Sequence, residues 1–390
     1  MSEIILTGDC RGVSSAHMEV AKHYSSPFLL GPPMCDGLVA LVEHMFTEEE
    51  AEVARHLKPL RARTAGGLAK DSGRPLHEVN EIMARLAHEK FVLGSVGNGS
   101  RELFSMLPIL PGTFELVMTL TDPGAVTPWH KRFAELYDSL INTGYLPDYF
   151  NKPVDGVRYL PVGESIENEP MAYPSDKLEV ILDRYKDFAV SNCCCRLTKQ
   201  LLGEGCGKAL ETCTIMGEAA PYLVSQGKMR TATRQEVLDI KREAEKQGLV
   251  TYTMNEESGR LFGNICSCCA CCCGALRTIS QFNAPGFIAP PHFMPRVDES
   301  KCKKCGKCAA ACQMKALVFL GEGKAKRLLH ERPRCIGCGL CSVACPNGNI
   351  SMQAVPGYKA PPKGWLSYLA KYGPRFLTNT LKVRSSRKGA

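Results

Sequence analysis

The sequence contains no apolar run close to the ~18 residues that a membrane-spanning helix requires, so we expect no transmembrane segment. Residues 1–11 include acidic side chains and lack a sustained apolar stretch, which gives no indication of a secretory signal. No Walker motif, flavin- or dinucleotide-type glycine fingerprint, nucleophile elbow or His-Glu-x-x-His helix is present. These absences argue against the best-marked nucleotide, hydrolase and metalloprotease sites, and no catalytic residue is identified.

Cysteine, in contrast, is abundant, with 21 in 390 residues. Only Cys10 and Cys35 lie in the N-terminal third of the chain. A chain of this length does not need disulfides to hold a small core together, so this many cysteines indicates free thiols in a reducing cytoplasm. The number of oxygen-labile sites that such thiols would make is typical of an anaerobe.

Two tetrads of cysteine with identical spacing lie near the C-terminal end. Each has the pattern Cys-x2-Cys-x2-Cys-x3-Cys, and the members are Cys302, Cys305, Cys308 and Cys312, then Cys335, Cys338, Cys341 and Cys345. At this spacing three thiolates ligate one [4Fe–4S] cluster and the fourth ligates the other. The predicted ligand sets are therefore Cys302, Cys305, Cys308 and Cys345 for cluster 1, and Cys335, Cys338, Cys341 and Cys312 for cluster 2. Zinc ribbons and fingers use separated pairs instead.

Residues 297–352 resemble a bacterial-type two-[4Fe–4S] ferredoxin, down to the Ala-Cys-Pro at 344–346 that closes the second tetrad. The first tetrad departs from this family because Gln313 stands where proline is usual. Without the fixed φ of proline, the turn after Cys312 is expected to be looser. The resemblance implies a ferredoxin-like domain that carries single electrons.

A second cysteine-rich stretch precedes the tetrads and contains eleven cysteines in two runs. The first run contains Cys193, Cys194, Cys195, Cys206 and Cys213, and the second contains Cys266, Cys268, Cys269, Cys271, Cys272 and Cys273. Residues 188–192 have the pattern of a short strand, along which alternate side chains share a face, so Cys193 and Cys195 are expected to point the same way. Together with Cys206 and Cys213 they form the predicted ligand set of a third cluster.

The second run is compatible with more than one ligand set. Cys266, Cys269 and Cys272 repeat the two-residue spacing of the tetrads, whereas Cys268 and Cys271 form an overlapping pair. A fourth [4Fe–4S] cluster, a non-cubane cluster and a structural zinc ion held by four cysteines all stay open for this stretch. The stretch resembles the central region of 4Fe–4S dicluster-domain proteins of anaerobic prokaryotes, which implies cluster binding and little more.

The N-terminal part differs from the rest in composition and pattern. Helices are predicted over residues 47–57, 64–71 and 75–89, the first opened by a capping box at Thr47, and a hairpin is predicted from 91–93 and 103–107. This order resembles a winged helix-turn-helix. Residues 31–120 carry nine Lys plus Arg against twelve Asp plus Glu, so the surface is a poor match for DNA phosphates. We expect a docking module and no nucleic-acid partner.

The net charge of +8 resides in the last part of the chain. Residues 353–390 contain eight Lys plus Arg and no acidic residue. Trp365, Leu366, Leu369 and Tyr372 recur at helical spacing, and Pro374 is expected to end that helix. Such a basic helix is typical of a segment that docks on an acidic partner or an anionic membrane surface, and packing of its aromatic residues back on the protein is the alternative.

The predicted fold class is α+β with several domains. Their boundaries are an N-terminal extension (1–30), a winged-helix-like domain (31–110), a helical connector (111–175), a cysteine-rich mixed α/β domain (176–284), the ferredoxin-like domain (296–352) and a basic tail (353–390). The predicted function is one-electron transfer between redox protein partners. Alternatives are an oxidoreductase with a catalytic central cluster fed by the ferredoxin-like domain, and a redox-sensing transcriptional regulator. Lys301, Lys303, Lys304 and Lys307 would favour the reduced clusters and attract acidic partners.

The cysteine count leads to a prediction about iron content. The eight tetrad cysteines account for two clusters, so a third in the central stretch brings the anaerobically purified protein to about twelve irons per chain or more. Iron and acid-labile sulfide analysis measures this directly. Iron near eight per chain, accompanied by stoichiometric zinc, would contradict a central iron–sulfur cluster.

Overall fold

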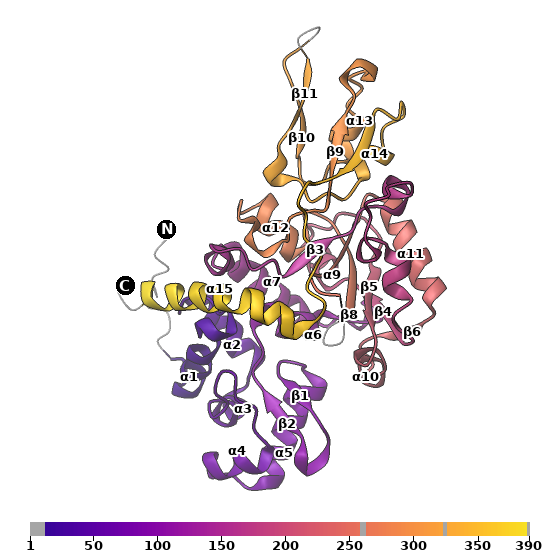
Figure 1. Ribbon diagram of the computed structural model, residues 1–390. Coiled ribbons are helices and arrows are strands. Elements are labelled where there is room, and N and C mark those ends of the chain that lie inside the picture. The colour runs from indigo at the N-terminus through magenta and orange to yellow at the C-terminus, as the bar shows by residue number, and fades with distance from the viewer. Residues whose placement is uncertain (1–11, 258–262, 323–325, 388–390) are drawn as a thin grey trace. The chain divides into compact units, whose positions relative to one another are not determined.

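The computed structural model describes residues 12–257, 263–322 and 326–387 (Figure 1). Cys10 and the other residues of segment 1–11 therefore lie outside the described residues. The chain is a mixed α/β structure that forms two compact units. The first takes Met1–Tyr149, Thr198–Glu204 and Leu377–Ala390, and the second takes Phe150–Leu197 and Gly205–Phe376. None of the helices in the described segments combines the length and the hydrophobicity that crossing a membrane demands.

The first unit is mainly helical. Its helices are α1 (Ser15–Tyr24), α2 (Asp36–Met45), α3 (Glu48–Ala54), α4 (Ala65–Ser72), α5 (Leu76–Ala84), α6 (Phe114–Met118) and α7 (Pro128–Asn142), and its strands are β1 (Gly94–Val96) and β2 (Leu103–Ser105). The capping box predicted at Thr47 is confirmed, because Thr47 and Glu50 exchange side chain-to-backbone hydrogen bonds at the start of α3. A single π-helical turn, Arg85–Glu89, continues α5.

The predicted position of the first hairpin strand is wrong. Strand β1 begins at Gly94 and pairs with β2 through Gly94↔Ser105, whereas residues 91–93 are not part of it. Phe91 adopts a left-handed φ of 56°, and Val92 and Leu93 are buried in the core, so the chain turns inward before the strand starts. Here the burial of two apolar side chains outweighs strand propensity and determines where β1 begins.

The second unit contains most of the strands. Its elements are β3 (Val157–Tyr159), α8 (Leu178–Leu182), β4 (Phe188–Asn192), α9 (Cys194–Leu201, which continues into the first unit), β5 (Glu211–Met216), α10 (Ala219–Ser225), β6 (Arg230–Ala232), α11 (Arg234–Lys246), β7 (Val250–Met254), β8 (Gly263–Cys268), α12 (Gly274–Ser280), β9 (Phe293–Val297), α13 (Lys307–Ala311), β10 (Leu317–Leu320), β11 (Arg327–His330), α14 (Leu340–Val343), β12 (Ile350–Ala354) and α15 (Trp365–Ser386, which also ends in the first unit).

Six of these strands form one antiparallel sheet in the order β3-β7-β8-β5-β4-β6. Helix α11 lies along it in Figure 1 and packs on β4, β5, β7 and β8. Val237 and Leu238 of this helix pack with Phe188, Val190 and Ile265 of the sheet. Because side chains alternate along a strand, the positions next to these apolar residues are directed to the opposite face. That opposite face holds cysteines.

Two further sequence expectations are corrected in this unit. Strand β4 ends at Asn192 and Cys194 already begins α9, so Cys195 lies on a helix and not on a continued strand. Thr233 caps α11 by accepting from the backbone N–H of Glu236, whose side chain pairs with Arg230. Helix α15 continues past Pro374 to Ser386, although one backbone donor is missing there.

Packing explains why α15 does not stop at the proline. In the second unit the Tyr368 hydroxyl donates to the carbonyl of Val154 at 2.9 Å. In the first unit the Asn379 amide donates to the carbonyl of Tyr149 at 2.8 Å, and Val383 is buried. These tertiary contacts on both sides of Pro374 outweigh the local cost of the proline.

The cysteine-rich stretch and the ferredoxin-like region share one hydrophobic core. Buried residues of the sheet and of α12, such as Val250 and Leu276, pack in one cluster with Met314, Ile336 and Leu340 of the ferredoxin-like region. Leu276 is fully buried there. A contiguous core of this kind makes the two regions parts of one compact unit.

Candidate metal centres

The ferredoxin-like region contains two cavities, each lined by four cysteines. The larger is lined by Cys312, Cys335, Cys338 and Cys341, and the smaller by Cys302, Cys305, Cys308 and Cys345. In both cavities three cysteines of one tetrad meet the fourth cysteine of the other tetrad. Four thiols around one cavity are the donor set that a [4Fe–4S] cluster requires, so the residues present fit this group.

Glycines with positive φ give the tetrads their shape. Gly306 (φ 83°) and Gly339 (φ 76°) immediately precede the short helices α13 and α14, which carry Cys308 and Cys341. A left-handed residue at this point reverses the chain between the second and third cysteine of each tetrad. At Gly339 a side chain would also collide with Ser165, so only glycine fits.

The two cavities differ in burial and charge. The larger has an apolar lining that includes Val250, Ile336 and Leu340, and burial raises the pKa of Cys338 to about 12. The smaller is lined by Lys303 and Lys304, and Cys305 in its wall is exposed. One cavity therefore opens on a cationic surface, whereas the other lies in the shared core.

The six-stranded sheet brings the cysteines of the two central runs together. Thr214 of β5 pairs with Ile265 of β8, so the next positions in the antiparallel register are Cys213 and Cys266. These two thiols are hydrogen-bonded to each other. Cys268, two residues further along β8, shares their face because alternate residues of a strand point the same way. Cross-strand pairing thus joins cysteines 53 positions apart in sequence.

Six thiols form a continuous chain of contacts, which we call the six-thiol group: Cys193, Cys195, Cys213, Cys266, Cys268 and Cys273. Hydrogen bonds link Cys213 to Cys266, Cys266 to Cys268, Cys268 to Cys273, Cys273 to Cys195 and Cys195 to Cys193. Donation from Cys213 and Cys268 lowers the pKa of Cys266. The buried hydroxyl of Tyr159 lies beside Cys273 and has no oxygen or nitrogen partner among the described residues.

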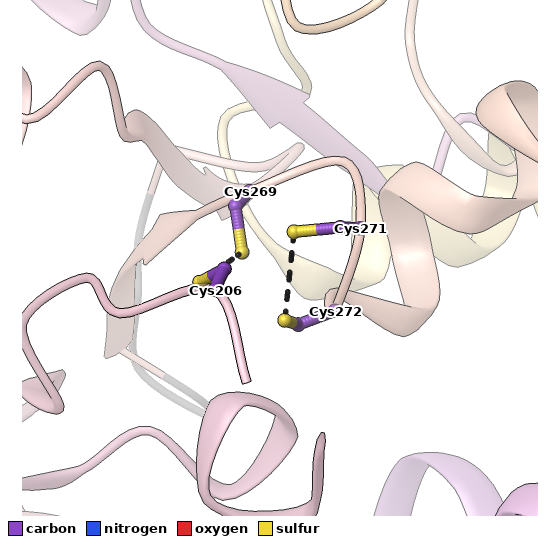
Figure 2. Close-up of side chains that lie close together, drawn as sticks. All are labelled: Cys206, Cys269, Cys271 and Cys272. Atoms are coloured by element: carbon purple, nitrogen blue, oxygen red, sulfur yellow. Dashed lines mark hydrogen bonds between the residues drawn. The ribbon is translucent and has the colours of Figure 1, made fainter. Parts of the chain in front are cut away.

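Four other thiols converge a short distance away and form the four-thiol group: Cys206, Cys269, Cys271 and Cys272. Figure 2 shows their sulfur atoms directed toward one another, with Cys206 on the loop after α9 and the other three on the loop between β8 and α12. The four Sγ atoms all lie within 4.8 Å of one another. The Sγ–Sγ distance is 3.9 Å between Cys206 and Cys269 and 3.6 Å between Cys271 and Cys272.

Two buried cations lie beside these thiols. Lys241 of α11 is fully buried, and its Nζ donates to the carbonyl oxygens of Thr212 and Ile265 at 2.6 and 2.7 Å. Burial lowers the pKa of Lys241, and the nearby thiols of Cys266 and Cys213 act in the opposite direction.

Arg196 of α9 is the second cation, and it is 2% exposed. Its guanidinium donates to the carbonyls of Ala209 and Ser267 and to the hydroxyl of Thr212. Burial alone would lower the pKa of Arg196, but the thiols of Cys193, Cys269 and Cys268 outweigh this effect and raise it. Donation from Cys272, together with Arg196, in turn lowers the pKa of Cys269 to about 5.

Gln313, the residue at which the first tetrad departs from the ferredoxin pattern, has a defined contact. Its Oε1 accepts from the backbone N–H of Ala270 at 2.8 Å, and its Nε2 donates to the carbonyl of Gly248. Ala270 stands between Cys269 and Cys271, and Gln313 directly follows Cys312. The side chain thus connects the wall of the larger cavity to the loop that carries three thiols of the four-thiol group, a role that its sequence position did not reveal.

Each of the two groups of central cysteines combines members of both runs. Of the predicted third set, Cys193, Cys195 and Cys213 belong to the six-thiol group, whereas Cys206 lies with Cys269. The cysteines of the second run are divided as well. The six-thiol group contains Cys266, Cys268 and Cys273, and the four-thiol group contains Cys269, Cys271 and Cys272. Sequence reasoning overlooked Lys241 and Arg196, although Arg196 directly follows a cysteine.

A known family matches the ferredoxin-like region. Residues 295–352 match the 4Fe-4S dicluster domain family. The archaeal-type glutamate synthases (NADPH) of Thermotoga maritima and Thermotoga sp. are 31% identical over 64 residues, which is 16% of this chain and 12% of theirs. An uncharacterized ferredoxin of Methanocaldococcus jannaschii is 29% identical over 59 residues, 15% of this chain and 77% of its own. No solved structure matches.

These similarities cover only a small part of this chain. The chain spans about an eighth of the length of the glutamate synthases it matches. The dicluster domain and the cysteine-rich centre nevertheless support [4Fe–4S] clusters as cofactors of this protein.

The contact of Gln313 generates a prediction for the cysteine loop. In Gln313→Ala the N–H of Ala270 loses its acceptor, and a hydrogen bond of this kind contributes about 1 kcal/mol, so hydrogen exchange of that amide should accelerate roughly fivefold. Exchange measured by mass spectrometry on the anaerobic protein tests this. Gln353→Ala, an exposed glutamine on β12, is the matched control. Unchanged exchange at Ala270 would show that the hydrogen bond does not hold the loop.

Proposed function

We propose that this protein is an iron–sulfur electron-transfer protein that passes single electrons between redox partners. The observation that carries the proposal is the shared core: the walls of the larger cavity, Cys312, Cys335 and Cys338, pack in the same cluster as Cys268 and Cys273 of the six-thiol group. When bound, [4Fe–4S] clusters supply one-electron redox chemistry. Cysteine sites within one core form a route along which electrons move without leaving the protein.

The ligand sets follow from the cavities. We assign Cys302, Cys305, Cys308 and Cys345 to one cluster and Cys335, Cys338, Cys341 and Cys312 to the other, because each set lines one cavity. We place a third cluster at the six-thiol group, whose members supply more than the four thiolates that a cluster uses. Lys241 and Arg196 support this placement, since buried cations require nearby negative charge and cluster-bound thiolates provide it.

The smaller cavity is the proposed contact point for redox partners. Lys303 and Lys304 line it, and Lys326 donates to the carbonyl of Lys304 while lying over the ring of Phe319. The exposed Cys305 brings this site close to solvent. A cationic rim around an accessible site favours acidic partners, because opposite charges speed association.

For the first unit we propose a winged-helix-like docking module and no DNA binding. The helices α3, α4 and α5 and the β1–β2 hairpin follow one another in winged-helix order, and Arg63 pairs with Phe104 at the base of the hairpin. The cations at the end of the third helix are occupied within the unit: Arg85 and Lys90 bind the buried carboxylate of Glu50 at 2.9 and 2.6 Å. Paired in this way, they are poorly available to phosphates.

Anaerobic reductive titration tests the electron-transfer function. The iron-loaded protein should accept at least two electrons per chain from dithionite without any substrate, with EPR signals of reduced clusters. Cys338→Ser should lose about four irons and one of these electrons, because it removes a thiolate of the buried cavity. Cys35→Ala, a buried cysteine of the first unit, is the control and should lose neither. An iron-loaded protein that accepts no electrons would refute the proposal.

The cationic rim leads to a kinetic prediction. In the Lys303→Glu/Lys304→Glu double variant, reduction by anionic dithionite should slow several-fold at low ionic strength, and reduction by cationic reduced methyl viologen should become faster. Both changes should shrink as salt is added, since salt screens exposed charges. Lys359→Glu/Lys363→Glu carries the same charge change elsewhere and serves as the control. Equal effects of both double variants would show that the cavity rim is not the contact point.

A further inference from the structure

The four-thiol group has the dimensions of a site for one metal ion. Tetrahedral zinc sites have Zn–S distances of about 2.3 Å, which places their sulfur atoms about 3.8 Å apart. Two of the sulfur–sulfur distances, 3.9 Å for Cys206–Cys269 and 3.6 Å for Cys271–Cys272, lie on both sides of this value. Among the residues that the structure describes, this is the group whose four ligand atoms all fall within 4.8 Å.

A [4Fe–4S] cluster would require a wider arrangement. Its four cysteine sulfurs each bind a different iron at a corner of the cube, so the body of the cluster separates them. The dicluster cysteines follow that pattern, because each set of four lines a cavity and, in the described part of the chain, neither set has its sulfur atoms within 4.8 Å of one another. The four sulfur atoms drawn in Figure 2 instead all lie within 4.8 Å of one another.

The loop that carries three of the four thiols is fixed in place by its backbone. Ala270, in the middle of it, donates its N–H to Gln313, and its carbonyl accepts from the hydroxyl of Ser280 at 2.9 Å. Ala244 and Leu249 pack against Cys269 and Cys272 and form an apolar wall. Ligands held by a second set of contacts bind a metal with less loss of conformational entropy.

Charge and access also suit a metal ion. Four thiolates around a divalent ion leave a net charge of −2, and the buried guanidinium of Arg196 is hydrogen-bonded to Cys269, where it offsets part of this charge. Cys271 is exposed, so an ion has a path from solvent. On binding, the thiols release their protons to solvent and no electrons are transferred, so the step needs no further reactant.

We propose that Cys206, Cys269, Cys271 and Cys272 bind a single zinc ion, separate from the iron–sulfur clusters. With all four positions taken by cysteine the site is closed, and its role is structural. The ion cross-links the loop after α9, which carries Cys206, and the loop between β8 and α12. Both loops also lie next to the six-thiol group, so the zinc ion fixes the backbone that positions those thiols.

Metal analysis of the full-length protein, purified anaerobically without added metal, tests the zinc site. We expect one zinc ion per chain in addition to the iron. Cys271→Ala and Cys206→Ala should each lose the zinc and keep the iron and acid-labile sulfide, because neither residue belongs to the iron–sulfur ligand sets assigned above. Cys35→Ala is the matched control and should keep both metals.

Cobalt exchange provides a second measurement that does not depend on how well a variant folds. Co²⁺ in place of zinc should give the visible ligand-field and thiolate charge-transfer bands of a tetrahedral Co(Cys)4 centre on the native chain. Absence of these bands overturns the proposal. Loss of about four irons in Cys271→Ala would show a cluster at this site, mononuclear iron in place of zinc would refute the metal assignment, and zinc retained in both variants would show an adventitious ion only.

These outcomes are independent of the proposed electron-transfer function. A protein that accepts electrons but contains no zinc refutes the zinc site alone. A protein that contains zinc and accepts no electrons refutes electron transfer and leaves the zinc site standing.

Discussion

Two buried cations set the electrostatic constraint on which the centre of this protein depends. Lys241 is completely removed from solvent, and its Nζ donates to the backbone carbonyls of Thr212 and Ile265. A lone buried ammonium costs several kcal/mol unless negative charge lies close by. The surrounding thiols raise the pKa of both side chains, against the effect of burial, so thiolates at these positions would offset the charge of Lys241 and Arg196.

Metal binding explains how buried cations and buried cysteines can lie next to one another. A thiol in an apolar core is neutral, whereas a metal-bound cysteine is a thiolate. The sheet, α9 and α11 hold the cations, and the loops after α9 and β8 hold the sulfur atoms, so cofactor loading and folding are expected to be coupled. Gln313 extends this coupling to the ferredoxin-like region, because the residue after Cys312 binds the loop of the four-thiol group through Ala270. The match to the dicluster domain family, residues 295–352, includes Gln313 but not Ala270.

Some features were predictable from sequence because they are local. Strand β4 occupies the predicted residues, Thr47 caps α3 as its capping box indicated, and residues 295–352 match the dicluster domain. The predicted end of the last helix at Pro374 failed for a non-local reason: contacts of Tyr368 and Asn379 with distant residues keep α15 intact. Similarly, the hairpin strand begins at Gly94 because burial of Val92 and Leu93 takes precedence.

The sequence by itself determined the cofactor class, because three closely spaced cysteines and a fourth after three residues reach one cluster and its neighbour through short turns. It also determined that the central stretch has more cysteines than a single cluster can use. Only the tertiary structure decided which central thiols meet. Cys213 faces Cys266 through strand register, and Cys206 reaches Cys269 across two loops, and neither relation is encoded in spacing along the chain. Cross-strand pairing joins residues by their position in a sheet, so ligand sets assembled in this way appear only once the chain has folded.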